Sequence, residues 1–423
     1  MQTNTRHESE HNMLTINSER FLALMDEQAR IGATSAGGLS RPALSEADAE
    51  ARTWFKQKAE QHGLTYRMDG AGNQSAVLES NHPNAKTLLI GSHLDSVPNG
   101  GRFDGALGVV AALETALTLK DAGESLPVHI EVINFTDEEG TIVGLLGSSA
   151  ITGQLSEHSL LHPRGGTDAL EAGMARVGIS RETMLTAQRD PDSLAGYIEV
   201  HIEQGTRLEE ANLNIGVVDS IVGIRSLWLT FKGEAAHAGT MPMQKRKDAY
   251  WGAAQFTLSA RDKIMADFHP GVVNFGEISL APGAFNIVPD TAKLGVEFRN
   301  GSIEQLDAME TTLLDLAQST ADDLHLTLDI TRMHDIQPAP MEDSFVAAVQ
   351  SACDTLDLSH TTLLSFAGHD AQALAQVTHS VMYFVPSVDG ISHNPREFTS
   401  DDDCINAANV MLQTVLHICE NDS

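Results

Sequence analysis

The sequence predicts an α/β protein with a mixed or parallel sheet, into which a smaller ferredoxin-like α+β domain is inserted. The first half alternates short apolar runs with a longer helical pattern: a run at residues 87–90, a helix at about 107–122 and a run at 128–135. Strand, helix and strand in this order are typical of a sheet whose strands are joined by crossover helices. Near residue 218 this pattern changes, which indicates a second domain.

The second pattern has strands at residues 220–233, 271–278, 291–299 and 324–332, and helices at 248–265 and 303–322. Strand, helix, strand, strand, helix and strand predict a ferredoxin-like unit. After Pro338 and Pro340 the first pattern returns, with a helix at 344–356, a strand at 381–385 and a helix at 401–418. We therefore expect one domain formed by residues 1–217 and 334–423, interrupted by a second domain of residues 218–333.

Composition limits the possible partners and the compartment. The 423 residues have a formal charge of −31, from 27 basic and 58 acidic side chains. This charge repels phosphate backbones and anionic lipids, which argues against nucleic-acid and membrane partners. The three cysteines have the spacing of neither a zinc ribbon nor a disulfide framework. Because the sequence also lacks a signal peptide and an apolar run long enough for a membrane span, we expect a cytoplasmic enzyme.

The N-terminal stretch HESEH, residues 7–11, formally matches the H-E-x-x-H zinc-protease pattern. That pattern needs an amphipathic helix and a third ligand. This copy lies in a polar terminus without an apolar face, so we expect no zinc site there.

The stretch GSHLDSVPNGGRFDGALG, residues 91–108, places His93, Asp95 and Asp104 directly after an apolar run. Loops at strand ends present ligand groups in α/β proteins, because the layer beneath them stays packed. His93 and Asp95 would face the same way on an extended strand. Asp95 is then placed to accept a hydrogen bond from the second ring nitrogen of a metal-binding His93. Asp104 follows a Gly-Gly turn that lets the chain curl back towards His93.

Other polar groups follow other apolar runs. Three adjacent carboxylates, residues 137–139, come after the run that ends at Phe135. Alone, they are consistent with a solvated loop, since adjacent carboxylates repel one another unless they are solvated or face a cation. His201 in YIEVHIEQG and His393 in SVDGISHNPRE are each, taken singly, consistent with an ordinary hydrogen-bonded histidine.

Taken together, these groups favour a metal centre. One aspartate can bridge two ions, and Glu138, beside a ligand in the sequence, can lie outside the metal shell and accept a proton from water. Three imidazoles and two carboxylates suit a pair of zinc-like ions, and here they are His93, Asp104, Glu139, His201 and His393.

Six stretches resemble a known family in their order and approximate spacing: GSHLDSVPNGGRFDG, FTDEEG, HIEQG, AHAGTMPMQKRKDA, GHDA and SHNPRE. The sequence is similar to the zinc-peptidase-like metallo-amidohydrolases of the carbamoylase branch over nearly its whole length. This branch includes N-carbamoyl-L-amino-acid hydrolases, allantoate amidohydrolases and β-ureidopropionases. The resemblance implies a mixed-sheet catalytic domain with an inserted ferredoxin-like lid and dimerisation domain, and hence a homodimer.

The resemblance also implies how the metal ligands divide. His93, Asp104 and His201 would hold one divalent ion, and Asp104, Glu139 and His393 the other. Zinc, manganese, cobalt and nickel all suit such ligands. Glu138 would be the general base, and Asp95 the partner that orients His93.

Further roles follow from the resemblance alone. His237 in AHAG would stabilise the oxyanion, Asn286 and Arg299 would bind the substrate carboxylate, and Gln204 would face the substrate. His369 in GHDA would belong to a loop on the substrate side. Without the resemblance, a turn cap explains His237, a turn residue explains Asn286, and an ion pair with surface carboxylates explains Arg299.

Two departures from the family pattern bear on the size of the substrate. EEGTIVGLLGS stands where many relatives have an arginine and a phenylalanine after the paired glutamates, and Phe366 is bulkier than the small residues common at its position. The resemblance implies hydrolysis of a ureido C–N bond, and an N-carbamoyl-L-amino acid is favoured over allantoate and β-ureidopropionate. An aminopeptidase or aminoacylase would use the same metal core. A non-catalytic metal- or ligand-binding protein is disfavoured by Glu138 and His237.

Overall fold

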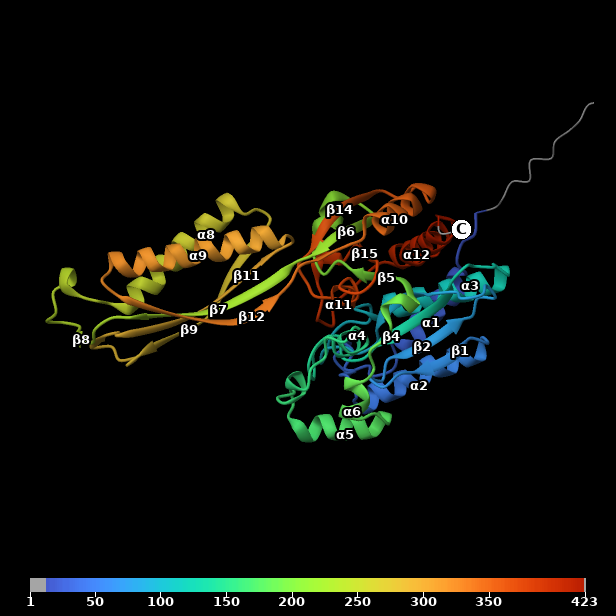
Figure 1. Ribbon diagram of the computed structural model, residues 1–423, viewed down its shortest axis with the longest axis horizontal. Coiled ribbons are helices and arrows are strands. Elements are labelled where there is room, and N and C mark those ends of the chain that lie inside the picture. The colour runs from blue at the N-terminus through green and yellow to red at the C-terminus, as the bar shows by residue number, and fades with distance from the viewer. Residues whose placement is uncertain (1–12, 422–423) are drawn as a thin grey trace, which may run out of the picture. The chain divides into compact units, whose positions relative to one another are not determined.

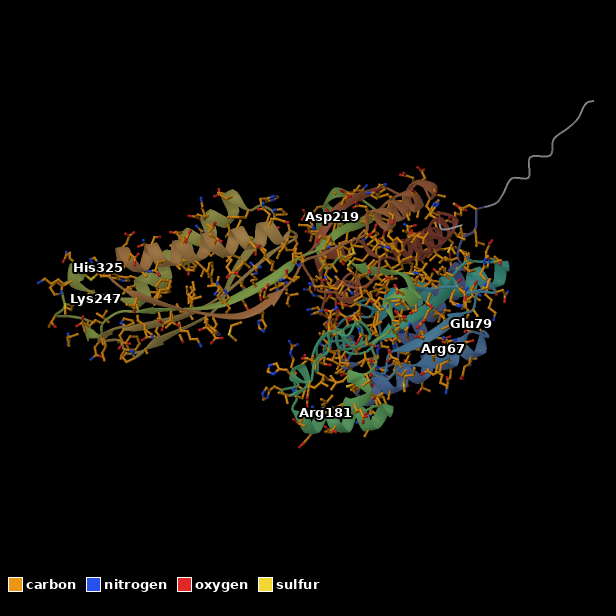
Figure 2. All side chains as sticks on the ribbon, viewed as in Figure 1. Arg67, Glu79, Arg181, Asp219, Lys247 and His325 are labelled. Atoms are coloured by element: carbon orange, nitrogen blue, oxygen red, sulfur yellow. The ribbon has the colours of Figure 1, made fainter. Side chains whose placement is uncertain are left out.

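The computed structural model describes residues 13–421, so the HESEH stretch lies outside the described residues. The chain divides into two compact units (Figure 1). The first unit extends to Val218 and includes Met341–Leu363 and the chain from His369 onward. The second contains Asp219–Pro340 and Leu364–Gly368, and Figure 2 labels Asp219, where it begins. Among the helices of residues 13–421, none has both the length and the apolar character needed to cross a membrane.

The first unit is built on a mixed sheet, as the sequence predicts. Its strands follow the order β1-β2-β4-β3-β5-β15-β6, and β14 pairs with β6. The neighbours β4, β3, β5 and β15 are parallel, whereas β1 is antiparallel to β2, β2 to β4 and β6 to β15. The strands are β1 (Thr65–Met68), β2 (Gln74–Leu78), β3 (Thr87–His93), β4 (His129–Phe135), β5 (Leu194–Ile202), β6 (Ile215–Ile221), β14 (His360–Ser365) and β15 (Ser380–Val385).

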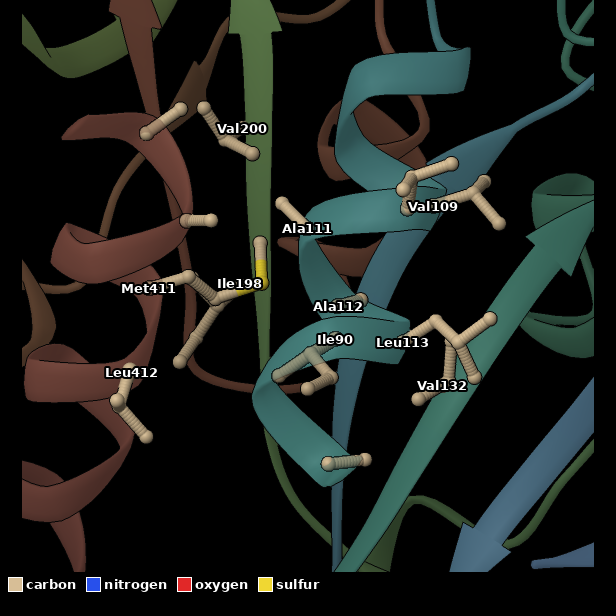
Figure 3. Close-up of a cluster of buried hydrophobic side chains, with 14 of the residues drawn as sticks. Ile90, Val109, Ala111, Ala112, Leu113, Val132, Ile198, Val200, Met411 and Leu412 are labelled. Carbon is tan, nitrogen blue, oxygen red and sulfur yellow. The ribbon is translucent and has the colours of Figure 1, made fainter. Parts of the chain in front are cut away.

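Helix α3 forms the centre of the first unit's core. Its side chains are mostly apolar on all sides, as expected of a buried helix. It packs against β3, and α12 lies beside it (Figure 3). It begins after Gly105 and ends at Gly123, whose left-handed conformation is a common helix C-terminal signal. The helices of this unit are α1 (Ser18–Gln28), α2 (Glu46–Gln61), α3 (Ala106–Ala122), α4 (Leu146–Ile151), α5 (Thr167–Val177), α6 (Arg181–Leu185), α7 (Arg207–Ala211), α10 (Asp343–Thr355), α11 (Asp370–Leu374) and α12 (Asp401–Asn421).

The second unit has the strand and helix order of a ferredoxin-like layout. Its four-stranded sheet follows the order β12-β7-β11-β9 with every pair antiparallel, and α8 and α9 share its core. The elements are β7 (Gly223–Lys232), β8 (Ala236–His237), α8 (Ala249–Asp267), β9 (Val272–Ala281), β10 (Ile287–Val288), β11 (Thr291–Asn300), α9 (Ile303–Asp323), β12 (Thr327–Ile336) and β13 (Ala339–Pro340).

Two strands differ from the predictions of residues 220–233 and 324–332. Ser220 and Ile221 belong to β6, and β7 begins at Gly223. Strand β12 begins only at Thr327, because Leu324 is the C-cap of α9 and His325 has a positive φ of 55°. Leu324 therefore ends helix α9 and does not begin strand β12.

Candidate metal centre

The candidate ligands lie at one edge of the first unit's sheet. His93 is the last residue of β3, and His201 is the last but one of β5. Residues 137–139 follow β4, and His393 lies in the loop after β15. Because the carboxyl ends of parallel strands meet at the same edge, residues far apart in sequence converge there.

Two groups of ligand atoms share Asp104. Its Oδ1 lies 3.0 Å from Nε2 of His201 and 3.7 Å from Nε2 of His93. Its Oδ2 lies 3.4 Å from Nε2 of His393, which is 3.3 Å from Oε2 of Glu139. Within each group the ligand atoms all lie within 4.8 Å of one another. The structure thus brings together all five predicted ligands, in the division that the resemblance implies, while their binding of metal remains a prediction.

The histidine rings are oriented by backbone carbonyls. Nδ1 of His93 lies 3.0 Å from the carbonyl oxygen of Asp95, and Nδ1 of His201 lies 2.9 Å from that of Ile202. These contacts favour a proton on each Nδ1 and leave Nε2 to face Asp104. Asp95 was expected to orient His93 through its carboxylate, but that group is 3.7 Å away. Strand β3 ends at His93, and the turn after it brings the Asp95 carbonyl closer.

Close packing at Gly105 helps to place His93. Gly105 has a φ of 62°, and a Cβ atom there would lie 2.3 Å from the His93 ring. Only glycine combines this left-handed backbone with such a close approach. The N–H of Gly105 donates to Nε2 of His201 at 3.1 Å. The residue after Asp104 therefore contacts both histidines of the first group.

The three adjacent carboxylates point to different partners, which separates their charges. Asp137 accepts hydrogen bonds from the N–H groups of Ile142 and Val143, at 3.0 and 2.6 Å, and so holds the loop that follows. Glu139 lies beside His393. Glu138 belongs to neither ligand group, and its Oε2 lies 3.4 Å from Nε2 of His93.

Asp95 and Gln204 also contact the centre. The Asp95 carboxylate accepts the N–H groups of Glu138 and Glu139, both at 3.3 Å, and so fixes the backbone at the two glutamates. Gln204 was predicted to face the substrate. Its Nε2 donates to Oδ2 of Asp104 at 2.9 Å, and this contact helps to orient the shared carboxylate.

His369 lies next to the first ligand group. Its ring centroid is 4.6 Å from that of His201, and its buried Nε2 has no hydrogen-bond partner. Helix α11, which begins directly after His369, is attached to the sheet by Glu199 of β5. This buried carboxylate accepts the N–H of Ala371 at 2.9 Å and the hydroxyl of Ser92 at 2.8 Å.

A fully buried arginine that sequence reasoning missed supports the His93 loop. Arg41 donates to the carbonyl oxygens of Leu94 and Gln28, and its backbone N–H donates to the hydroxyl of Ser96. Burial lowers the pKa of Arg41 to about 10. No local pattern marks such a residue, because its role depends on burial beneath a loop that is distant in sequence.

The electrostatics of the centre favour a cation. Burial, followed by the charges of Asp370 and Glu139, raises the pKa of Glu138 well above its usual range. Burial also lowers the pKa of His93. A divalent ion among these groups would favour the ionised carboxylates and the neutral imidazole.

Three predicted site residues belong to the second unit: His237, which was expected to stabilise the oxyanion, and Asn286 and Arg299, which were expected to bind the substrate carboxylate. Nδ1 of His237 accepts the N–H of Gly239 at 3.1 Å, and the backbone carbonyl of Asn286 accepts the N–H of Ala238 at 2.9 Å. Arg299 donates through Nε and Nη2 to Glu297, at 3.0 and 2.8 Å, and through Nη1 to the carbonyl oxygen of Phe366 at 2.7 Å. The local contacts of His237 and Arg299 are those that each residue would make without a ligand, so their substrate roles remain predictions.

The donor set fits a metal centre. Nε2 of His93 is buried and has no hydrogen-bond partner, which is unusual for a ring nitrogen and expected for a metal ligand. Imidazole and carboxylate around a shared aspartate are ligands that zinc, manganese, cobalt and nickel accept. The fold and the two candidate ligand groups are those expected of a metal-dependent hydrolase.

Comparisons with known proteins give the family. Residues 89–417 match the model of peptidase family M20/M25/M40. The N-carbamoyl-L-amino acid amidohydrolase of Geobacillus stearothermophilus is 32% identical over 409 residues, covering 96% of this chain and 100% of that protein. The allantoate amidohydrolase of Escherichia coli (strain K12) is 32% identical over 373 residues, covering 87% and 90%.

A solved structure has the same fold. The hydantoinase/carbamoylase family amidase from Burkholderia ambifaria is 34% identical, with a TM-score of 0.86, and the match covers 96% of this chain and 99% of that one. The chain belongs to peptidase family M20/M25/M40, which confirms the resemblance, and it is a hydrolase that acts on C–N bonds.

Proposed function

We propose that this chain hydrolyses the carbamoyl group of an N-carbamoyl-L-amino acid, with two divalent ions held at the candidate metal centre. Water adds to the carbamoyl carbon, the C–N bond to the amino acid breaks, and the carbamate that leaves decomposes to carbon dioxide and ammonia. The main support is the sharing of Asp104 by two ligand groups with Glu138 beside them. Several curated relatives that cover nearly the whole chain are named as enzymes with this activity.

The two ions would supply a Lewis acid that polarises the carbamoyl oxygen and makes water more acidic. His93, Asp104 and His201 would hold one ion, and Asp104, Glu139 and His393 the other. Glu138 takes the proton from the attacking water and returns it to the leaving amine. Burial raises the pKa of Glu138 well above its usual range, and a higher pKa makes a carboxylate a stronger proton acceptor.

The substrate carboxylate would bind to Arg299 and Asn286. The contacts of Arg299 with Glu297 and Phe366 use three of the five N–H donors of its guanidinium group. One N–H on each terminal nitrogen is left for a bidentate pair with a carboxylate. His237 would stabilise the negative charge that develops on the carbamoyl oxygen. Gln204 and His369 would contact the ureido group.

We also propose that the chain forms a homodimer, as the family resemblance implies.

Allantoate is the second candidate substrate. It is also a ureido compound with a carboxylate, and two curated relatives are named as allantoate amidohydrolases. The same catalytic groups would act on either compound. Discrimination between the two candidates would therefore depend on the residues that contact the rest of the substrate and not on the catalytic groups.

A substrate panel tests the proposal. The protein is stripped of metal and assayed for ammonia release from N-carbamoyl-L- and N-carbamoyl-D-amino acids, allantoate and β-ureidopropionate, with manganese, cobalt, nickel or zinc added back. N-acetylamino acids and dipeptides, followed by amine release, serve as amide controls. We expect turnover of an N-carbamoyl-L-amino acid only after metal is added. Turnover of allantoate alone would select the second candidate, and no turnover by any metal-loaded sample would favour a non-catalytic binding protein.

A further inference from the structure

A buried carboxylate outside both ligand groups reaches the centre by two routes. Glu397 is 5% exposed, and its Oε1 accepts the N–H groups of Phe103 at 3.0 Å and Asp104 at 3.1 Å. Its Oε2 lies 3.0 Å from the hydroxyl oxygen of Ser392, which lies 2.8 Å from Oδ2 of Asp104. Glu397 therefore contacts the backbone of Asp104 directly and its carboxylate through Ser392.

The loop before α3 is shaped around this carboxylate. A Cβ atom at Gly101 would lie 2.0 Å from both Cδ and Oε1 of Glu397. Real Cβ contacts are not that short, so any other residue at position 101 would push the carboxylate away. This close approach is a separate observation from the hydrogen bonds, and it shows that the chain at Gly101 packs tightly against Glu397.

A carboxylate is costly to bury unless it is well hydrogen-bonded, and the N–H groups of Phe103 and Asp104 both donate to this one. The bonds join two segments far apart in sequence: the loop that holds Asp104 and the loop that holds Ser392 and His393. No step of the proposed reaction uses Glu397. We propose that Glu397 is a positioning residue for the candidate metal centre, fixing the backbone at Asp104 and, through Ser392, the orientation of its shared carboxylate.

This inference rests on the proposed two-ion centre, and it predicts the behaviour of two substitutions. Glu397→Ala removes the acceptor of both N–H groups and the partner of Ser392. Loss of a group that orients a metal ligand typically weakens metal binding about 10- to 100-fold. Glu397→Gln keeps an amide oxygen that accepts the two N–H groups, and its NH₂ can donate to the Ser392 oxygen while the Ser392 hydroxyl donates to Asp104. We therefore expect Glu397→Gln to restore most of the affinity.

Metal titration tests the inference without any substrate. The full-length protein is stripped of metal and titrated with manganese by isothermal calorimetry, and its thermal unfolding without metal is recorded. Glu114→Ala is the matched control: Glu114 is a buried carboxylate on α3 that accepts the N–H of Asn17 at 3.0 Å and pairs with Arg20, and it belongs to neither ligand group. Glu397→Ala should lose affinity by the stated factor, and Glu114→Ala should lose stability but keep its affinity.

Each outcome decides the question. If wild-type protein binds manganese but Glu397→Ala binds it equally well, or if Glu114→Ala loses as much affinity, the inference is wrong and the proposed function stands. If wild-type protein binds no divalent ion, the two-ion function fails and the inference fails with it. Should Glu397→Ala not fold, Gly101→Ala displaces the same carboxylate without removing it, and unchanged affinity in that variant would contradict the inference.

Discussion

Replacement of Glu138 by glutamine should stop turnover and leave metal binding intact. Glu138 belongs to neither ligand group, and the N–H groups of Glu138 and Glu139 are both held by the Asp95 carboxylate at 3.3 Å. Glutamine has the same shape and keeps this backbone contact. The substitution therefore removes the proton acceptor and little else.

The size of the loss follows from the lack of a substitute base. Loss of a general base typically costs about 10²- to 10⁴-fold in rate, or about 3–5 kcal/mol of transition-state stabilisation. Four of the neighbouring carboxylates are already engaged: Asp104 and Glu139 lie in ligand groups, Asp95 accepts two N–H groups, and Asp137 holds the following loop. We therefore expect the upper half of that range, a fall in kcat of about 10³-fold or more.

The assay compares two adjacent glutamates. The kcat for ammonia release is measured at saturating metal, and bound metal is measured by mass spectrometry after dialysis, for Glu138→Gln and Glu139→Gln. Glu138→Gln should keep its metal. Glu139→Gln should lose part of the metal and recover some activity when metal is added. If Glu138→Gln kept more than a tenth of the wild-type turnover, or lost metal as Glu139→Gln does, the assignment of the base would be refuted.

Three further predictions concern the second unit, the core and the charge. Glu297→Gln should loosen Arg299 and raise KM about fivefold for a substrate with a free carboxylate but not for its amide, a loss of about 1 kcal/mol that paired kinetics would detect. Leu113→Ala, in the centre of the core in Figure 3, should lower the free energy of unfolding by about 2–5 kcal/mol in a urea titration, and a loss below about 1 kcal/mol would contradict the packing. Because the net charge is −31, the melting temperature should rise between about 0.05 and 1 M sodium chloride as repulsion is screened, and a fall would count against net repulsion.

Much of the candidate site could be predicted because each ligand follows a pattern that is local in sequence. His93 comes directly after an apolar run, and residues 137–139 come after another, so the strand ends could be placed. The parallel order of β4, β3, β5 and β15 then brings these ends together. The spacing of residues could not show which ligands share Asp104, because that depends on how the loop of residues 99–105 turns back over the sheet.

The residues that were missed act through contacts between distant segments. Arg41 lies beneath the His93 loop, and Glu397 bonds to Phe103 and Asp104 although almost 300 positions separate them. Glu397 ends the SHNPRE stretch, so its presence was visible but its partners were not. Burial converts an ordinary charged residue into a positioning group, and burial is a property of the whole fold.

The segment Leu364–Gly368 changes the interpretation of Phe366. This segment packs with the second unit, and the next residue, His369, packs against His201 in the first. Arg299 bonds to the backbone carbonyl of Phe366, so the contact depends on the path of the chain and not on the size of the side chain. A smaller residue at position 366 would keep this hydrogen bond, so the departure at Phe366 leaves the contact of the proposed carboxylate anchor intact. The segment contributes the Phe366 carbonyl that Arg299 contacts, and it ends directly before His369, so the backbone and not the side chain of Phe366 is what supports the proposed anchor.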